Sequence, residues 1–156
     1  MTLETASLFL VDEAATAALA GRVAPLLRAG DTILLEGDIG AGKTAFARAL
    51  IRARLGREED VPSPTFTLVQ TYDDPEAEIW HCDLYRLTNP DEILELGLDA
   101  AFEDGICLIE WPDRLGTAAP TSALKLSLLQ EGDGRIAQFE GPDTWIARLR
   151  SGGALG

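Results

Sequence analysis

The residues best suited to chemistry lie in one short segment, GDIGAGKT, from Gly37 to Thr44. Their spacing is G-x-x-x-x-G-K-[ST], which is typical of a loop that binds phosphate groups. Glycines let successive backbone N–H groups point inward around an anion, and the start of a following helix adds a positive dipole end. Lys43 supplies a charge for the outer phosphates, and the Thr44 hydroxyl is an oxygen ligand of the kind that Mg²⁺ prefers. The spacing therefore predicts a nucleotide site.

Two carboxylates elsewhere in the chain are candidates for the same site. A phosphate-loop ATPase needs an acidic group near the metal at the end of a neighbouring strand, and Glu110 ends the apolar run ICLIE. In the segment IWHCDLYR, strand alternation puts His81, Asp83 and Tyr85 on one face. We predict that Glu110 holds Mg²⁺, directly or through water, and that Asp83 orients or deprotonates the attacking water. His81 fits either a structural or a functional role.

Two further segments flank these candidates. In SPTF, Ser63 and Thr65 are hydroxyl groups held between prolines, where nucleotide-sensing loops of this fold class lie. They fit either switch residues near a γ-phosphate or a stiff connecting loop. Trp111 directly follows Glu110, so continued strand alternation would point the two side chains to opposite faces. We therefore expect Trp111 in the core or behind the site.

These residues must be positioned by alternating strands and helices. Strands are expected at 7–11, 32–37, 66–72, 78–87, 105–111, 123–130 and 135–141. Helices are expected at 13–30, broken at Gly21 or Pro25, and at 43–55, 89–97 and 142–150. This order predicts a single α/β P-loop NTPase domain over residues 1–150, with a mostly parallel central sheet flanked by helices and with antiparallel hairpins. The tail 151–156 is expected to be frayed.

Composition narrows the range of partners. The 156 residues suffice for one domain with a core, and 13 basic against 26 acidic residues give a net charge of −13. A chain with this much negative charge repels a phosphate backbone and is unsuited to binding it directly. We therefore expect a partner to hold any nucleic acid.

Cys82 and Cys107 form no C-x-x-C pair and fit buried thiols. The acidic N-terminus is no signal peptide, and no apolar run is long enough to span a membrane, so we expect a cytoplasmic protein.

Four of the basic residues lie close together: Arg48, Arg52, Arg54 and Arg57. Cations near a helix C-terminus are ordinary. In so acidic a chain, the cluster also fits a docking patch.

Five segments together resemble the bacterial TsaE (YjeE) family: GDIGAGKT, SPTFTL, HCDLYRL, ELGLD and LIEWPDRLG, in that order and spacing. The resemblance covers roughly residues 8–141. It implies a small P-loop ATPase that uses ATP and Mg²⁺ and is required for N6-threonylcarbamoyladenosine at position 37 of tRNAs that read ANN codons. It implies TsaB and TsaD as partners, with TsaD transferring the threonylcarbamoyl group and tRNA contacted only through the partners. Hydrolysis would be weak alone and stimulated by them.

The resemblance also assigns roles to residues. It implies phosphate binding by the loop and the start of its helix, that is, by Gly37, Asp38, Ile39, Gly40, Ala41, Gly42, Lys43, Thr44 and Ala45. It implies that Thr44 and Glu110 hold the metal and that Lys43, Thr65 and Asp83 belong to the catalytic region. It further implies that Asp12, Glu13, Thr16, Trp111 and Arg135 help to hold the nucleotide.

Two alternatives keep the phosphate loop but change the function. A small-molecule kinase would carry an acceptor pocket and an arginine-rich lid, and no such lid segment is visible in the sequence. A GTPase-like switch usually reads guanine through an N-K-x-D loop, whereas the nearest segment here is NPDE at 89–92. The oligomeric state is open.

Overall fold

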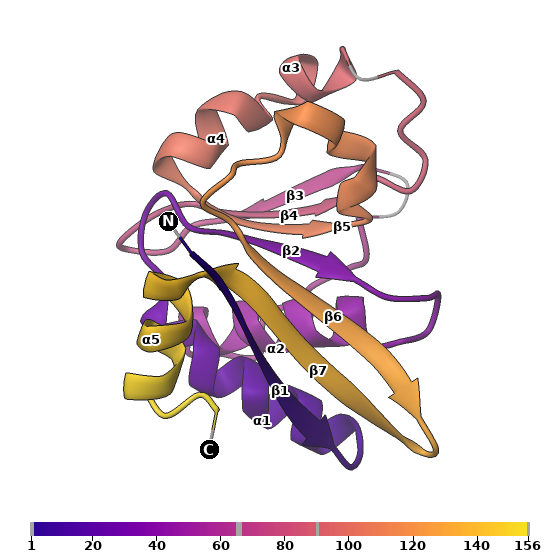
Figure 1. The fold of residues 1–156 in the computed structure, drawn as a ribbon. Coiled ribbons are helices and arrows are strands. Elements are labelled where there is room, and N and C mark those ends of the chain that lie inside the picture. Colours follow the sequence, from indigo (N-terminus) through magenta and orange to yellow (C-terminus); the bar gives the residue numbers. More distant parts are fainter. Residues whose placement is uncertain (1, 65–66, 90, 156) are drawn as a thin grey trace.

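The computed structural model describes residues 2–64, 67–89 and 91–155, which form a seven-stranded sheet with helices on both faces (Figure 1). The strand order is β1-β7-β6-β2-β5-β4-β3. The strands are β1 (Leu3–Leu10), β2 (Thr32–Glu36), β3 (Val69–Tyr72), β4 (Ile79–Asp83), β5 (Ile106–Glu110), β6 (Leu124–Glu131) and β7 (Gly134–Pro142). The helices are α1 (Glu13–Val23), α2 (Lys43–Leu55), α3 (Glu92–Leu96), α4 (Leu98–Asp104) and α5 (Asp143–Ser151), with 3₁₀ turns η1 (Ala24–Leu26) and η2 (Pro112–Ala118).

The centre of the sheet is parallel and its two edges are antiparallel. Strand β2 pairs in parallel with β5 and β6, and β4 pairs in parallel with β5. The hairpin β3–β4 closes one edge, and the hairpin β6–β7 together with β1 closes the other. This confirms the predicted α/β class with a mostly parallel centre. It also brings the carboxyl ends of β2, β4 and β5 to one side of the sheet, where ligands bind in open α/β folds.

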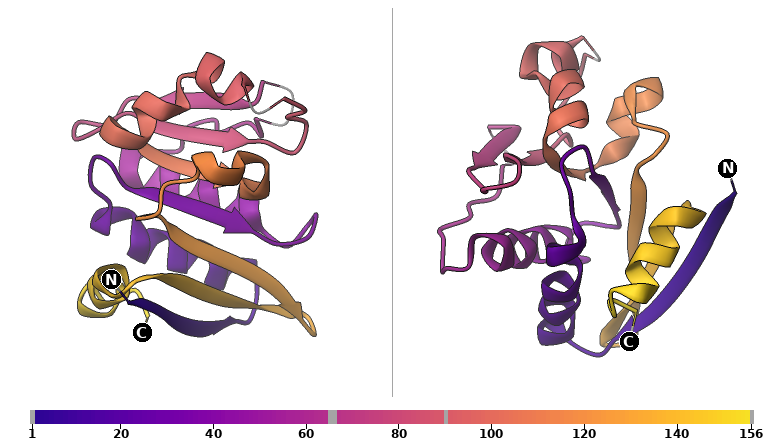
Figure 2. Two further views of the ribbon diagram at one scale, coloured as in Figure 1. Left: turned by 45° about the horizontal axis from the view of Figure 1, so that its top comes forward. Right: turned by 90° about the vertical axis from the view of Figure 1, so that its left-hand side faces the viewer.

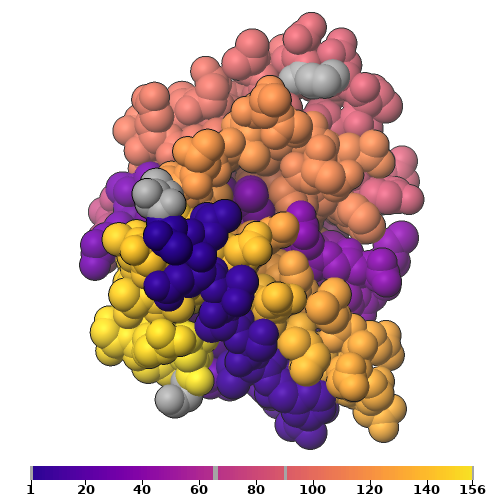
Figure 3. All heavy atoms as spheres, in the orientation of Figure 1, coloured from indigo at the N-terminus to yellow at the C-terminus, as the bar shows by residue number. Residues whose placement is uncertain are grey.

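Strand alternation divides the core into two clusters. On β5, Ile106 and Leu108 belong to the cluster that contains residues of α1, α2 and α5, whereas Cys107 and Ile109 belong to the cluster that contains residues of α3, α4 and η2. Both sets are fully buried, because a parallel central strand is covered on its two faces. Figure 2 shows α1 and α2 packed together, away from α3 and α4. In Figure 3, β1 and β7 form part of the surface, where Phe9 is 53% exposed.

Local sequence explains where the helices begin and end. The Asp12 carboxylate accepts a hydrogen bond from the backbone N–H of Ala15 and so caps α1. Helix α1 passes through Gly21 and stops before Pro25, so of the two expected breaks only the proline acts. Helix α2 ends at Leu55 and is capped by Gly56, whose φ of 68° is the left-handed conformation that glycine favours.

Two terminal predictions differ from the structure. Strand β1 begins at Leu3 rather than Ser7, because β7 is long enough to pair with the whole segment. The tail that we expected to be frayed packs on the domain: Ala154 is fully buried, and its carbonyl accepts a hydrogen bond from the Arg22 guanidinium. Pro90, the expected first residue of the 89–97 helix, lies outside the described residues.

Both cysteines are buried free thiols, as predicted. Burial raises the pKa of the Cys82 thiol well above its usual value and that of the Cys107 thiol to about 12, so both stay protonated and unreactive. Within the described residues, no helix is both long and apolar enough to cross a membrane.

Candidate nucleotide site

The predicted phosphate loop joins the end of β2 to the start of α2, which is the context that the motif requires. Gly37 and Gly42 have φ values of 146° and 108°, which residues with a side chain rarely adopt. A Cβ atom at Gly37 would also lie 2.6 Å from the carbonyl oxygen of Leu128 on β6. The two glycines therefore allow the chain to turn tightly against β6 and to enter α2 with its N-terminus facing the loop.

Lys43, the first residue of α2, is buried under the loop. Its ammonium group donates hydrogen bonds to the carbonyl oxygens of Gly37 and Asp38 and lies 4.3 Å from the centre of the Trp111 ring. Burial lowers the pKa of Lys43, while the charges of Glu110, Asp83 and Asp38 act in the opposite direction. The Lys43 ammonium group is thus a desolvated cation held by two carbonyl oxygens. The oxygens of a bound anion can take their place.

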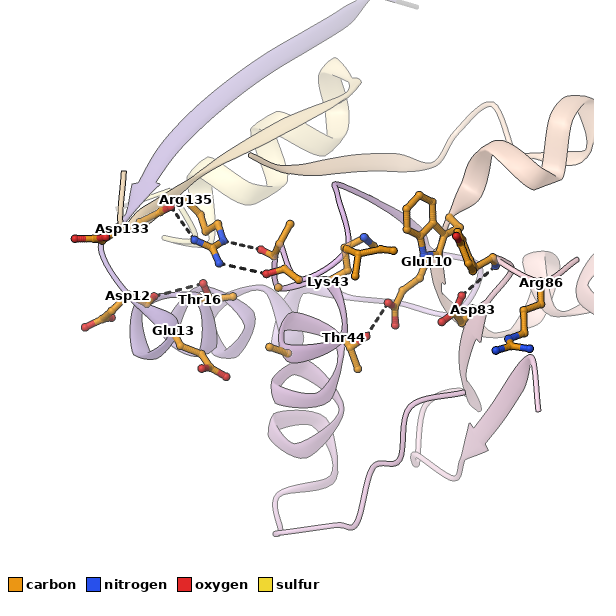
Figure 4. Close-up of a pocket in the computed structure, with 18 residues that line it drawn as sticks. Asp12, Glu13, Thr16, Lys43, Thr44, Asp83, Arg86, Glu110, Asp133 and Arg135 are labelled. Carbon is orange, nitrogen blue, oxygen red and sulfur yellow. Dashed lines mark hydrogen bonds between the residues drawn. The ribbon is translucent and has the colours of Figure 1, made fainter. Parts of the chain in front are cut away.

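Thr44 and Glu110 are in direct contact, although they lie 66 residues apart in the chain. The Thr44 hydroxyl donates to Oε1 of Glu110 over 2.8 Å (Figure 4). Oε2 of the same carboxylate lies 2.7 Å from Nε2 of His81. Glu110 is only 2% exposed and His81 is fully buried. The structure therefore brings the two predicted metal ligands together and adds His81 behind them.

Asp83 lies beside Glu110 on the next strand. The two residues are paired in the β4–β5 register, and both side chains are on the face that carries α2. One oxygen of Asp83 accepts a hydrogen bond from the backbone N–H of Tyr85 over 3.0 Å, which fixes the carboxylate at the strand end. As predicted from alternation, His81 and Asp83 share this face, while Cys82 and Leu84 belong to the cluster on the other face. Tyr85 follows the end of the strand.

The position of Trp111 differs from the expectation. Strand β5 ends at Glu110, and Trp111 adopts a left-handed conformation with φ 58° and ψ 54°. Alternation therefore stops one residue early, and the indole turns back toward Lys43 instead of entering the opposite core. Its ring packs against that of Tyr85, with centroids 4.9 Å apart. A left-handed backbone is unusual for a bulky residue, and here it places an aromatic wall in the site.

The opposite side of the site comes from the start of α1 and from the β6–β7 hairpin. Asp12 and Glu13 are exposed at the first turn of α1, and Thr16 is buried behind them. Arg135, two residues after the hairpin turn, donates to the carbonyl oxygens of Ala41 at 3.0 Å and Gly40 at 3.2 Å (Figure 4). The guanidinium thus ties the hairpin to the phosphate loop.

Most of these groups line one pocket of about 710 Å³, a volume typical of small-molecule sites. Of the residues that we predicted, the pocket is lined by Asp12, Glu13, Thr16, Ile39, Gly40, Ala41, Gly42, Lys43, Thr44, Ala45, Asp83, Glu110, Trp111 and Arg135. Gly37 and Asp38 are not in the lining and instead contact Lys43 through their carbonyl groups. Thr65, the third predicted catalytic residue, lies outside the described residues.

The lining also contains four residues that sequence reasoning did not include among the site residues: Tyr85, Arg86, Asp133 and Gly134. Tyr85 and Arg86 lie two and three residues after Asp83 in the segment HCDLYRL, and Asp133 and Gly134 directly precede Arg135. Adjacency to a predicted site residue at the end of a strand was the available signal.

The comparisons with known proteins show the family of this chain. The family model described as "Threonylcarbamoyl adenosine biosynthesis protein TsaE" matches residues 10–137 of the chain. The chain belongs to the TsaE family. The match begins at the end of β1 and ends within β7, so it includes every described residue of the pocket.

Individual TsaE proteins align over most of the chain. A protein of Rickettsia bellii named "tRNA threonylcarbamoyladenosine biosynthesis protein TsaE" is 39% identical over 140 residues, covering 89% of this chain and 97% of its own length. The Bacillus subtilis protein of the same name is 39% identical over 76% of this chain and 73% of its own. The crystal structure of Bacillus subtilis YdiB superimposes with a TM-score of 0.82 at 27% identity, over 98% of this chain and 97% of that one.

The donor atoms of this TsaE-family pocket fit Mg²⁺ bound with a nucleotide. Thr44 and Glu110 present oxygen atoms within 2.8 Å of each other, and oxygen is the ligand type that Mg²⁺ prefers. In the described residues, no group of three or more His, Cys, Asp or Glu side chains could hold a metal by itself.

The arginine cluster has a structural explanation in this TsaE-family chain. Each member donates hydrogen bonds within the chain: Arg48 to the carbonyl of Val61, Arg52 and Arg57 to Glu59, and Arg54 to Asp74 and to the carbonyls of Ala24 and Leu27. The cluster therefore fastens α2 to the segment after it and to the β3–β4 turn. The docking role stays a prediction without support from these contacts.

Proposed function

We propose that this chain is a Mg²⁺-dependent ATP-binding and ATP-hydrolysing subunit required for threonylcarbamoyladenosine at position 37 of tRNAs that read ANN codons. Family membership and the names of its relatives support the tRNA-modification role. The observation that carries the nucleotide role is the contact between Thr44 and Glu110 at the end of the phosphate loop. That contact joins the loop to Glu110, an acidic residue at the end of a neighbouring strand. Phosphoryl transfer by a phosphate-loop enzyme needs such a carboxylate near the metal.

In this proposal, the loop and Lys43 bind the triphosphate. Backbone N–H groups at the start of α2 and the positive end of its dipole favour an anion. Lys43 exchanges the carbonyl oxygens of Gly37 and Asp38 for phosphate oxygens. An anion beside the ammonium group favours its charged form, so nucleotide binding should oppose the lowering of the Lys43 pKa by burial.

Thr44 and Glu110 would hold Mg²⁺, which, when bound, neutralises charge on the phosphate oxygens and polarises the phosphoryl group. Asp83, beside Glu110 on the same face, orients the attacking water and accepts its proton. Thr65 stays a predicted switch residue. The ring of Trp111 shields the ammonium group of Lys43 from water, which strengthens electrostatic interactions inside the pocket.

The opposite wall would hold the rest of the nucleotide. Asp12, Glu13 and Thr16 lie at the start of α1, and Arg135 fixes the hairpin against the loop. In this proposal, these groups hold the nucleoside, while the loop holds the phosphates.

We further propose that the chain acts in the cytoplasm with TsaB and TsaD, and that these partners, not this chain, hold the tRNA. The net charge of −13 supports this division, because a strongly acidic surface repels a phosphate backbone. Hydrolysis in one subunit then drives turnover in an assembly that transfers the threonylcarbamoyl group elsewhere.

The test is the threonylcarbamoyladenosine content of tRNA in cells depleted of this chain. The modified nucleoside should fall on depletion, return with the wild-type chain and stay low with Lys43→Ala at equal protein level. Unchanged modification after depletion would contradict the tRNA role. Full rescue by Lys43→Ala would contradict the need for the phosphate loop.

A further inference from the structure

The single histidine of the chain, His81, lies behind the proposed metal site. It is fully buried in β4, opposite Gln70 of β3 and Leu108 of β5 in the strand registers. Its Nε2 atom lies 2.7 Å from Oε2 of Glu110. It does not line the pocket, so a ligand there is not expected to touch it.

The direction of this hydrogen bond depends on the imidazole tautomer. An ionised carboxylate only accepts hydrogen bonds, so beside ionised Glu110 the Nε2 atom of His81 carries the hydrogen that joins the two groups. The other ring nitrogen, Nδ1, is buried and has no hydrogen-bond partner among the described residues. A hydrogen on Nδ1 would be a buried unsatisfied donor, which costs free energy. The hydrogen on Nε2 is therefore the arrangement that the surroundings favour.

Glu110 has a competing partner on its other side. The charges of Glu110 and Lys43 act on each other, and a glutamate side chain has enough rotatable bonds to turn toward an ammonium group. In the structure, Glu110 instead places one oxygen on Thr44 and the other on His81. Two donors on two different elements, α2 and β4, thus determine where the carboxylate points.

We propose that His81 is a positioning residue, which holds the Glu110 carboxylate on Thr44 and away from Lys43 and so sets the affinity of the site for Mg²⁺. This inference rests on the proposed Mg²⁺–nucleotide function and adds a residue to it. Residues that orient a metal ligand from behind typically change metal affinity by about 10–100-fold when replaced. His81 acts through Glu110 and is not itself a catalytic residue.

The first test measures ADP binding to the full chain while Mg²⁺ is titrated, with a parallel titration in EDTA. Three variants are compared. His81→Leu removes the donor but keeps an apolar side chain of similar size, and His81→Gln keeps an N–H donor. Ile79→Val is the matched control, because it removes a buried methyl group from the same strand and face, outside the pocket.

We expect His81→Leu to raise the Mg²⁺ concentration for half-maximal ADP binding by about 10–100-fold, while ADP binding in EDTA stays near wild type. His81→Gln should recover most of this loss, and Ile79→Val should match wild type. Wild-type Mg²⁺ dependence in His81→Leu overturns the inference and leaves the proposed function standing. If the wild type itself binds no ADP at any Mg²⁺ concentration, the proposed function fails.

The second test does not depend on the folding of any variant. With one histidine in the chain, a proton–nitrogen spectrum of the wild type reports this imidazole without overlap. We expect the hydrogen on Nε2, slow exchange with water, and a change in its shift when Mg²⁺ and ADP are added together but not when ADP is added in EDTA. A hydrogen on Nδ1, or an imidazole chemical shift that stays the same when Mg²⁺ and ADP are added together, would contradict the positioning role.

Discussion

The two walls of the pocket are built differently. The inner wall, made of Lys43, Thr44, Asp83 and Glu110, comes from the start of α2 and from the ends of two neighbouring parallel strands. Three of its four side chains are at most 6% exposed, and Glu110 and Thr44 are hydrogen-bonded to each other. The outer wall, made of Asp12, Glu13, Asp133 and Arg135, comes from the first turn of α1 and from a hairpin turn, and its three carboxylates are exposed.

This difference separates two tasks. Buried, mutually bonded groups are held in one arrangement and interact strongly because water does not screen them, which suits the proposed chemistry at the phosphates. Exposed groups on turns interact more weakly, which suits contacts with the rest of a nucleotide. We therefore expect substitutions in the inner wall to change turnover strongly and those in the outer wall to change affinity modestly.

The largest effect is expected from Lys43→Ala. Removing the charge that contacts the phosphates should lower ATP hydrolysis by roughly 10³-fold, the upper end for losing one preorganised donor to developing charge. The circular dichroism spectrum and melting temperature should stay near wild type, because among the described residues Lys43 donates hydrogen bonds only to loop carbonyls. Normal hydrolysis by this variant would show that the inner wall does not bind the phosphates.

Asp83→Asn should have the next largest effect on ATP hydrolysis. This substitution should lower turnover much more than it lowers ATP affinity. If Asp83 accepts a proton from water, kcat should fall by about 10²-fold with ATP affinity nearly unchanged. Single-turnover kinetics and equilibrium binding measure the two quantities separately. An equal fall in both would make Asp83 a ligand-holding group instead.

Arg135→Ala tests the outer wall. The side chain ties the hairpin to Gly40 and Ala41, and losing such hydrogen bonds costs on the order of 1 kcal/mol each. ATP affinity should fall by about fivefold to thirtyfold, for the loss of one or both hydrogen bonds, with kcat within about twofold of wild type, as measured by steady-state kinetics. A loss as large as that of Lys43→Ala would erase the distinction between the walls.

Asp74→Asn should leave both walls intact and change only stability. Asp74 pairs with Arg54 at the far end of α2, over 2.7 Å with both side chains buried. Burial alone would raise the pKa of Asp74, but hydrogen bonds from Arg54 and from the backbone lower it below its ordinary value of 3.8. The free energy of unfolding should fall by about 1–3 kcal/mol at pH 7, with ATP hydrolysis unchanged at 25 °C.

The pH dependence of this effect has a definite sign. A carboxylate with a lowered pKa in the folded state stabilises the protein above its unfolded pKa, and this contribution disappears as the pH falls through the lowered value. The stability difference between wild type and Asp74→Asn should therefore be constant near neutral pH and shrink below about pH 4. Urea unfolding at several pH values measures it. Glu76→Gln is the control, because Glu76 is mostly exposed and lies 3.9 Å from Arg54.

The inner wall was largely predictable from the sequence, because its parts follow rules of short range. Loop spacing identified Lys43 and Thr44, and an apolar run ending in a carboxylate identified Glu110. Alternation placed Asp83 on the polar face of its strand, together with His81. Alternation misplaced Trp111, which the family resemblance had put beside the nucleotide, because alternation ends where the backbone turns left-handed, and no local pattern marks that residue. The bond between His81 and Glu110 was also invisible, since it depends on the register of two strands. The packed tail depends in the same way on a distant contact, from Arg22.

The most direct test of the central claim is ATP hydrolysis with Mg²⁺, measured for the chain alone and then with its cognate TsaB–TsaD pair. The account predicts weak turnover alone that rises with the pair and vanishes in Lys43→Ala. Turnover that the pair leaves unchanged, or that survives in Lys43→Ala, would contradict it.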